Sequence, residues 1–331
     1  MQPFVPLVRN PHLLTILGNF WPRTIDEVRF PPHRRIVETE PGVSILVISQ
    51  MPEVPPRAHL ILVHGLEGSS DAGYKRSMAQ HALESGIAVH RFNMRSCGGT
   101  EELALTNYHA GQTSDLLFFV RSLRSESPAP IFLTGFSLGG NVVLKLAGEL
   151  DDAGPELLAG VCAVSTPLDL GACVELLRRP ANFIYEWRFL SRLKERIRKR
   201  AAQAPGHYSA RDLHTVHTVY DFDDRYTAPL FGFGTAANYY ATQSSKNFLD
   251  RIRVPALLVQ AQDDPLIPFT VYDQPAFLAN RRLRLIAPEH GGHLGFVSRG
   301  KPRFWLDQVV LEWIESQIRV SEPLTPALPL P

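Results

Sequence analysis

The chain has 331 residues, and its 34 lysine and arginine residues against 33 aspartate and glutamate residues leave a formal net charge of +1. This balance argues against a nucleic-acid partner, which usually requires a basic excess or a basic face. With 44% hydrophobic and 20% charged residues, the composition excludes a chain that is disordered over most of its length.

The start of the chain does not resemble a signal peptide, and no apolar stretch predicts a membrane span. Prolines at Pro3, Pro6 and Pro11 would interrupt the helix of a signal peptide. The longest apolar runs, such as Leu157–Val164, are far shorter than the ~18 residues that a membrane helix needs. The three cysteines, Cys97, Cys162 and Cys173, are too few for a disulfide framework and favour a reducing compartment. We therefore expect a soluble, cytoplasmic protein without a transmembrane segment.

Short apolar runs alternate along the chain with longer segments of helical periodicity. This alternation predicts an α/β fold with a mostly parallel central sheet and helices on both faces. The expected strands are Val43–Ser49, His59–Val63, Ile87–Phe92, Pro130–Gly135, Gly160–Ser165, Ala256–Ala261 and Leu283–Ala287. The expected helices are Gly73–Glu84, Thr113–Arg124, Leu138–Leu150, Val271–Asn280 and Arg303–Ile318.

The interval from Thr166 to Arg253 contains no convincing strand. It holds a basic helical segment, Phe183–Arg200, and an aromatic and acidic stretch, Tyr220–Tyr240, that we interpret as a loop. We expect one domain over residues 1–331, with a helical cap inserted at residues 170–250 over the carboxyl ends of the strands, where open α/β sheets bind ligands. A proline-rich, flexible tail is expected over residues 321–331.

Gly135-Phe136-Ser137-Leu138-Gly139 forms a G-x-S-x-G motif between the predicted strand 130–135 and the predicted helix 138–150. This strand–turn–helix context is that of a nucleophile elbow, in which small neighbours allow a strained turn that exposes the serine. A glycine-rich turn with a serine helix cap would give the same letters. We interpret Ser137 as a catalytic nucleophile.

A serine nucleophile needs a base and an orienting acid, which follow it in the order Ser, Asp or Glu, His in this type of fold. The expected strand 256–261 leads into two adjacent acids, Asp263 and Asp264. Pro268, four residues after Asp264, matches the spacing common in such enzymes, so we select Asp264 and keep Asp263 as the alternative.

Two histidines, His290 and His293, follow the last expected strand. Glycines on both sides of His293 suit a loop that must approach the nucleophile closely, so we assign the base to His293 and a supporting place in the loop to His290. The oxyanion hole needs backbone N–H donors, which we expect from Leu66, in the glycine-rich turn 64–70, and from Leu138.

Taken together, several strings resemble the YheT-type α/β-hydrolase esterases, which are related to yeast acyltransferases that make medium-chain ethyl esters and to membrane-anchored animal lipid hydrolases. These strings are NPHLLTILGNFWPR (10–23), HGLEGSSDAGYKRSMA (64–79), NMRSCGGTE (93–101), YHAGQTSDL (108–116), GFSLGGNVVLK (135–145), YYATQSS (239–245), QDDPLIP (262–268) and GGHLGF (291–296). The resemblance implies an α/β-hydrolase fold, the same three residues Ser137, Asp264 and His293 in catalysis, and hydrolysis of short- or medium-chain carboxylic esters, including acylglycerols. Glu67, within HGLEGS, resembles the bacterial form of this loop.

The predicted function is that of a serine ester hydrolase with a small-molecule substrate and an acyl-enzyme intermediate. The alternatives are an acyltransferase, in which an alcohol replaces water, and a binding protein that keeps the fold without turnover. No HExxH, paired CxxC or GxGxxG string is present in the sequence, so we expect neither a metal nor a cofactor. The sequence does not indicate an oligomeric state.

The segment Phe183–Arg200 has one apolar helical face and a strongly basic remainder. It is either a cap helix with a solvated basic face or a peripheral contact with an anionic membrane surface. Asp221, Asp223 and Asp224 lack the spacing of a calcium loop, and we expect them to be structural. Tyr239 and Tyr240 are expected to pack within the cap or to line an acyl pocket.

Overall fold

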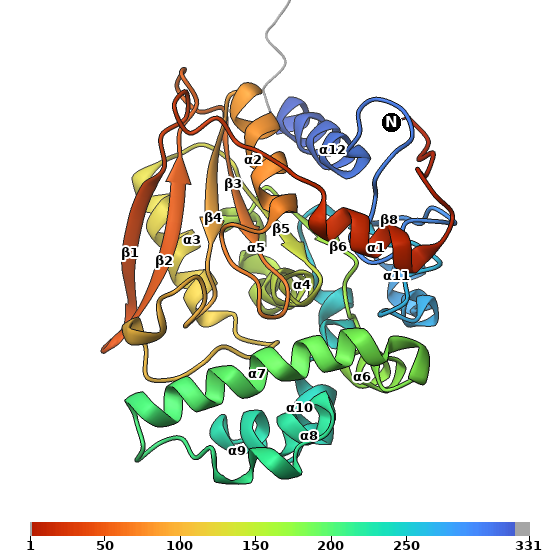
Figure 1. Ribbon diagram of the computed structural model, residues 1–331. Coiled ribbons are helices and arrows are strands. Elements are labelled where there is room, and N and C mark those ends of the chain that lie inside the picture. Colours follow the sequence, from red (N-terminus) through yellow and green to blue (C-terminus); the bar gives the residue numbers. More distant parts are fainter. Residues whose placement is uncertain (1, 322–331) are drawn as a thin grey trace, which may run out of the picture.

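An eight-stranded sheet forms the centre of the computed structural model, which describes residues 2–321 (Figure 1). The strands are β1 (His33–Glu40), β2 (Val43–Gln50), β3 (Ala58–Val63), β4 (Ile87–Phe92), β5 (Ile131–Phe136), β6 (Gly160–Val164), β7 (Ala256–Val259) and β8 (Leu283–Ile286). Their order in the sheet is β1-β2-β4-β3-β5-β6-β7-β8. β2 pairs with β1 and β4 in antiparallel fashion, and every pair from β4 to β8 is parallel. The mostly parallel sheet predicted from the sequence is thus confirmed.

The helices are α1 (Pro11–Phe20), α2 (Gly73–Glu84), α3 (Ser114–Glu126), α4 (Leu138–Leu150), α5 (Gly154–Leu157), α6 (Leu170–Leu177), α7 (Phe183–Gln203), α8 (Val219–Phe222), α9 (Ala228–Leu230), α10 (Ala236–Gln243), α11 (Pro275–Ala279) and α12 (Trp305–Ser321). Alternate residues of the central strands point to opposite faces, so Ile61 and Val63 pack with α3 and α4 while Leu60 and Leu62 pack with α2 and α12. Burial on both faces explains why these strands are continuously apolar in the sequence.

The edge strand β1 was not predicted from the sequence. Its residues HRRIVETE are mostly polar, and its side chains alternate between exposed and half-buried positions. Charged side chains on an edge strand hinder pairing with other chains, so a search for apolar runs overlooks such a strand. All seven predicted strands are present, with ends that differ by at most two residues.

Between β6 and β7 the chain forms helices α6 to α10, which we call the inserted helices. Figure 1 shows α7 to α10 together beside one end of the sheet. The prediction of a loop over Tyr220–Tyr240 is wrong, because this stretch is mostly helical. Thr218 caps α8 in a reciprocal capping box with Asp221, and Thr235 caps α10. A π-helical turn, Asp223–Thr227, joins α8 to α9.

Two further expectations are corrected by the structure. The single helix predicted at Val271–Asn280 is divided into a 3-10 turn at Phe269–Tyr272 and the short helix α11, which begins at Pro275. Proline lacks the N–H that a continuing helix would need, and this explains the break. The helix α1 was missed, although Asn10, whose side chain accepts from the Leu13 N–H, and Pro11 are typical helix-start residues.

Of the proline-rich tail predicted over residues 321–331, only Ser321, the last residue of α12, is described, and residues 322–331 lie outside the described part of the chain. Within residues 2–321, none of the helices combines the length and the apolar character needed to cross a bilayer.

Candidate active site

Ser137 occupies the sharp turn between β5 and α4. Its backbone lies at φ 52° and ψ −124°, a conformation that residues other than glycine rarely adopt. The turn is held by a hydrogen bond from the Ser137 N–H to the Val164 carbonyl (2.8 Å). A side chain at Gly135 would have its Cβ 2.2 Å from the Gly139 carbonyl oxygen, so only glycine fits beside the turn. The Ser137 hydroxyl makes no capping bond to α4 and is available for another partner.

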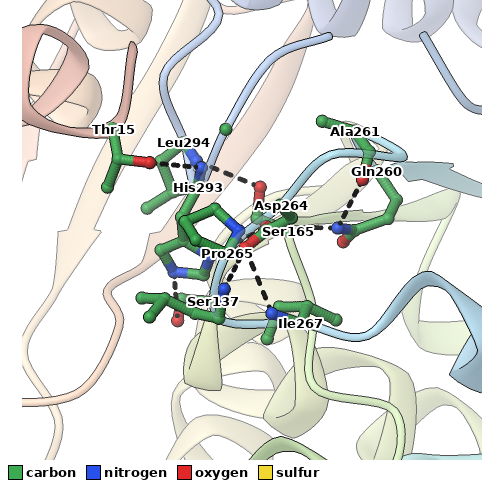
Figure 2. A network of polar contacts seen from close by, with 12 residues as sticks. Thr15, Ser137, Ser165, Gln260, Ala261, Asp264, Pro265, Ile267, His293 and Leu294 are labelled. Atoms are coloured by element: carbon green, nitrogen blue, oxygen red, sulfur yellow. Dashed lines mark hydrogen bonds and ion pairs between the residues drawn. The ribbon is translucent and has the colours of Figure 1, made fainter. Parts of the chain in front are cut away.

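That partner is His293. Its Nε2 lies 3.0 Å from Ser137 Oγ, and its Nδ1 lies 2.9 Å and 3.2 Å from the two carboxylate oxygens of Asp264 (Figure 2). A proton on Nδ1 that is donated to the carboxylate leaves Nε2 free to accept the serine proton. The three residues selected from the sequence therefore meet in one hydrogen-bonded chain.

The carboxylate of Asp264 is fully buried and is held by three donors in addition to His293. Oδ1 accepts from the N–H groups of Leu266 and Ile267, and Oδ2 accepts from the Gln260 side-chain amide at 3.1 Å. Fixed donors of this kind compensate the burial of a charge and fix the direction in which the carboxylate points.

The alternative residues form a second pair next to the first. Asp263 Oδ2 lies 3.1 Å from His290 Nδ1, and Asp263 Oδ1 accepts from the Gly292 N–H at 2.9 Å. These hydrogen bonds stabilise the loop that carries His293. Among residues 2–321, the hydrogen bond to Ser137 Oγ comes from His293 and not from Asp263 or His290.

Helix α1 supports the same loop from outside. The His293 N–H donates to Thr15 Oγ1 (2.8 Å), which itself donates to the Pro11 carbonyl, and a Cβ at Gly18 would lie 2.5 Å from the Gly295 Cα. Thr15 was not predicted as a site residue, because no local sequence pattern links residues that are 278 positions apart. Ser165 also contributes by accepting from the Leu294 N–H (Figure 2).

The expected oxyanion donors, Leu66 and Leu138, both line the cavity above Ser137. Within residues 2–321, no acceptor is found for the N–H group of either residue. The turn that carries Leu66 is anchored by the ring of His64. Its Nδ1 lies 2.8 Å from the Gly65 carbonyl oxygen, and its Nε2 accepts a hydrogen bond from the Met94 N–H. Burial lowers the pKa of His64 to about 3, so the ring is neutral and satisfied on both sides.

Glu67, the next residue of the turn, has a positive φ of 53° and forms a two-pronged ion pair with Arg196 of α7. Both of these contacts measure 3.0 Å, and the two side chains are nearly buried, with 7% and 11% exposure. Tyr108 accepts from the Glu67 N–H and donates to its carboxylate. The loop with the candidate oxyanion donor is thereby joined to the inserted helices.

The cavity next to Ser137 and His293 is mostly apolar. Its walls come from the inserted helices and from the loop after β7, with aliphatic and aromatic side chains such as Leu170, Val174, Leu193, Phe222, Phe231 and Ile267. Tyr239 and Tyr240 are buried and line this cavity. Such a cavity suits an acyl chain.

Asp223 and His109 are among the polar residues of this lining. Burial raises the pKa of Asp223, in the π-helical turn, to about 6, although its hydrogen bonds with Thr227 and Tyr240 act in the opposite direction. Burial lowers the pKa of His109 to about 3, and its ring packs against Phe231 and Tyr239.

Other candidate residues have structural roles. Asp221 caps α8 and Asp224 accepts from the Ala236 N–H, and no cluster suited to a metal ion occurs among residues 2–321. Cys97, Cys162 and Cys173 are buried free thiols, and burial raises the pKa of Cys97 to about 12, which opposes its reaction as a thiolate.

Comparison with known proteins identifies a matching family model and several similar proteins. Residues 58–299 match the family model described as alpha/beta hydrolase fold. The chain is 30% identical over 327 residues to the putative esterase YheT of Escherichia coli, covering 96% of this chain and 94% of that protein. It is 26% identical to the phospholipase ABHD3 of Mus musculus and 26% identical to a monoacylglycerol lipase of Saccharomyces cerevisiae. These two matches cover 81% and 77% of this chain but only 66% and 58% of the respective relatives.

Solved structures show the same fold at low sequence identity. An esterase of Pyrococcus furiosus superposes with a TM-score of 0.60 at 18% identity, covering 96% of this chain and 99% of that structure. The hydrolase of 2,6-dihydroxy-pseudo-oxynicotine superposes with a TM-score of 0.61 at 19% identity, covering 90% and 71%.

Proposed function

This chain belongs to the α/β-hydrolase family, and from that membership we propose that it is a serine hydrolase of short- to medium-chain carboxylic esters, including acylglycerols. The observation that carries the proposal is the continuous chain of hydrogen bonds from Ser137 through His293 to the buried carboxylate of Asp264. The names of the esterase and lipase relatives support the same reaction class.

In the proposed mechanism, Ser137 Oγ attacks the carbonyl carbon of the ester while His293 Nε2 takes its proton. Asp264 keeps the imidazole in the required tautomer and stabilises the imidazolium that forms. The negative charge on the carbonyl oxygen is met by the N–H groups of Leu66 and Leu138, and the positive end of helix α4 favours that charge.

Collapse of the tetrahedral intermediate breaks the bond to the alcohol, which leaves with the proton held by His293. Water then attacks the carbonyl carbon of the acyl-enzyme while His293 takes a proton from it. The bond to Ser137 Oγ breaks, His293 returns the proton to this oxygen, and the carboxylic acid is released. The inserted helices act as a cap whose apolar cavity holds the acyl chain, and the size of that cavity sets the preferred chain length.

The test is a chain-length series of p-nitrophenyl esters assayed with the wild-type protein and with Ser137→Ala. Removal of the nucleophile is expected to lower kcat by about 10³-fold or more. An organophosphonate should label the wild-type serine and leave the variant unlabelled. Near wild-type turnover by Ser137→Ala would refute the assignment, whereas a wild-type protein that binds esters without hydrolysing them would indicate a binding protein.

An added alcohol separates hydrolysis from acyl transfer. If the free carboxylic acid stays the main product in the presence of excess ethanol, water is the natural acceptor. Formation of ethyl ester as the main product would instead identify an acyltransferase that uses the same three residues.

A further inference from the structure

Helix α1 has apolar side chains on two opposite faces. The inner face, with Leu14, Thr15 and Gly18, is buried against the loop that carries His293. The outer face presents Leu13, Ile16 and Phe20, which are 46% to 63% exposed. Packing against the interior of the protein explains the inner face, whereas the outer face remains largely exposed.

The first two turns of α7 show the same feature. Phe183, Ile184 and Trp187 are 61% to 72% exposed, whereas Leu190, Leu193 and Ile197, farther along the same helix, are buried. Each turn of a helix that packs only against its own domain would normally present polar groups to solvent. These turns instead present three large apolar side chains.

Contacts between α1 and α7 bring the two apolar faces together. The rings of His12 and Tyr185 stack, and His12 Nδ1 lies 3.1 Å from the Tyr185 hydroxyl oxygen. The Arg188 guanidinium lies 5.2 Å from the centre of the Phe20 ring. In Figure 1 the red helix α1 lies above the first part of the green helix α7. We call the six exposed residues of the two helices the apolar patch: Leu13, Ile16, Phe20, Phe183, Ile184 and Trp187.

Beyond the apolar patch, the exposed charged side chains of α7 are mostly basic, with Glu195 as the acidic exception. Arg188, Arg192, Lys194 and Arg198 follow the apolar patch along the helix, and none of them forms an ion pair with a carboxylate of residues 2–321. Lys199 is paired with Glu195. Cations that form no ion pair, next to exposed tryptophan, phenylalanine and isoleucine, are the composition of helices that lie in the headgroup region of an anionic bilayer.

We infer that the apolar patch and the basic face of α7 together form a docking surface for an anionic lipid bilayer. The apolar side chains enter the boundary between headgroups and acyl chains, and the cations contact the negatively charged headgroups. The occupant is a lipid surface because basic side chains outnumber acidic ones along α7 next to the patch, and the exposed Glu195 is paired with Lys199.

The position of this surface connects it to the candidate active site. On its inner side α1 holds the backbone of His293 through Thr15, and α7 contributes Phe189 and Leu193 to the wall of the cavity. An ester lipid in the docked bilayer would therefore lie next to the helices that enclose the acyl cavity. This last point rests on the proposed function, whereas the binding of the bilayer does not.

The experiment is a co-sedimentation of full-length Ser137→Ala protein with vesicles, so that hydrolysis does not alter the lipid. One set of vesicles contains phosphatidylcholine alone, and the other contains phosphatidylcholine and phosphatidylglycerol at about 7:3. We expect partitioning onto the anionic vesicles that is several-fold stronger than onto the neutral ones and that decreases with added salt.

Two variants in this background separate the apolar and the charged contributions. Ile184→Ser with Trp187→Ser should lower partitioning about tenfold or more on anionic vesicles. Lys194→Gln with Arg198→Gln should lower it to a similar extent on anionic vesicles and leave the neutral ones unchanged. The matched control is Ile36→Ser, which removes an apolar side chain of comparable exposure (65%) from the edge strand β1 and should have no effect.

Several results would overturn the inference: no partitioning of the parent protein, partitioning that the patch variants leave intact, or equal loss in the Ile36→Ser control. A dimer in sedimentation velocity that the patch variants dissociate, without vesicle binding, would show that a second copy of the chain covers the surface. Because the Ser137→Ala background is used throughout, a failure of vesicle binding is distinct from a failure of the proposed hydrolase activity.

Discussion

At the scale of single residues, the candidate site depends on side chains held at unusual backbone positions. Ser137, Ser165 and Leu294 all have positive φ angles, and Ser165 Oγ accepts from the Leu294 N–H next to His293. Residues other than glycine persist in this region only where the surrounding contacts determine them. The short distance between Ser137 and His293, which are 156 positions apart, thus results from contacts of the neighbouring turns.

The two adjacent acids allow a test at this scale. Asp264→Asn is expected to lower kcat for a p-nitrophenyl ester by about 10³-fold, because an amide cannot hold the imidazole in the required tautomer or stabilise its charged form. Asp263→Asn should lower kcat by less than about tenfold, since Asp263 contacts His290 and the Gly292 N–H and not His293. A larger loss in Asp263→Asn than in Asp264→Asn would transfer the role of the acid to Asp263.

At the scale of elements, helix α7 has three separate surfaces. Its buried residues pack over the core and the cavity, and its exposed residues include half of the apolar patch and the basic side chains. Arg196 and Arg200 connect it to loops at the end of the sheet. The Arg196–Glu67 pair is the most direct of these connections to the candidate oxyanion loop, because Glu67 follows Leu66.

We predict that this ion pair positions the oxyanion loop. Glu67→Gln and Arg196→Met should each lower kcat by about tenfold or more with a smaller change in KM, because the N–H of Leu66 acts on charge that develops in the transition state. Each single variant should also destabilise the fold by about 3 kcal/mol through the buried charge left unpaired, and the double variant should cost less than the sum of the two.

The control for this prediction is Glu195→Gln, which removes the exposed pair between Glu195 and Lys199 on the same helix. It should change kcat and the unfolding free energy only slightly, because exposed pairs contribute little. Loss of stability in Glu67→Gln with an unchanged kcat at a temperature where the protein is fully folded would show that the pair supports the fold alone.

At the scale of the whole molecule, several histidines are buried in neutral form. Burial lowers the pKa of His64, His90 and His109 from 6.5 to about 3 in each case. His90 Nδ1 lies 2.8 Å from Ser49 Oγ and its Nε2 lies 3.0 Å from His59 Nδ1, so the ring belongs to a network within the sheet. A proton on any of these rings would place a charge in the interior.

The direction of the pH dependence follows from these shifts. Between pH 6.5 and about 3 the unfolded chain binds protons that the folded chain does not, so the unfolding free energy decreases as the pH falls through this range. The contribution of these rings is complete above pH 6.5, and each accounts for a slope of about 1.4 kcal/mol per pH unit. Urea unfolding from pH 7.5 to pH 4.5 measures the effect.

Variants distinguish the histidines from the carboxylates that also titrate in this range. His90→Leu should reduce the slope by about 1.4 kcal/mol per pH unit, whereas the exposed His214, changed to Gln, should leave it unaltered. An identical slope in the wild-type protein and His90→Leu would contradict the neutral state of the buried ring.

The sequence by itself determined the elements whose patterns are local. Continuous apolar runs identified seven of the eight strands, and the sequence around Ser137 identified the elbow, because a strand, a glycine-rich turn and a helix follow one another directly in the chain. The preference for Asp264 and for His293 also rested on local spacing, and the structure brings these two residues together with Ser137.

Only the tertiary structure decided the features that join distant segments. The polar edge strand β1 has no apolar run of its own, and the helices α8 to α10 are stabilised by caps and by packing around the cavity. The contacts of Thr15 with His293 and of Glu67 with Arg196 span 278 and 129 positions. The apolar patch arises likewise, because the outer faces of α1 and α7 become one surface only when the fold places these helices side by side. Periodicity reports which face of an element is apolar, but the partner of that face is set by the packing of the complete chain.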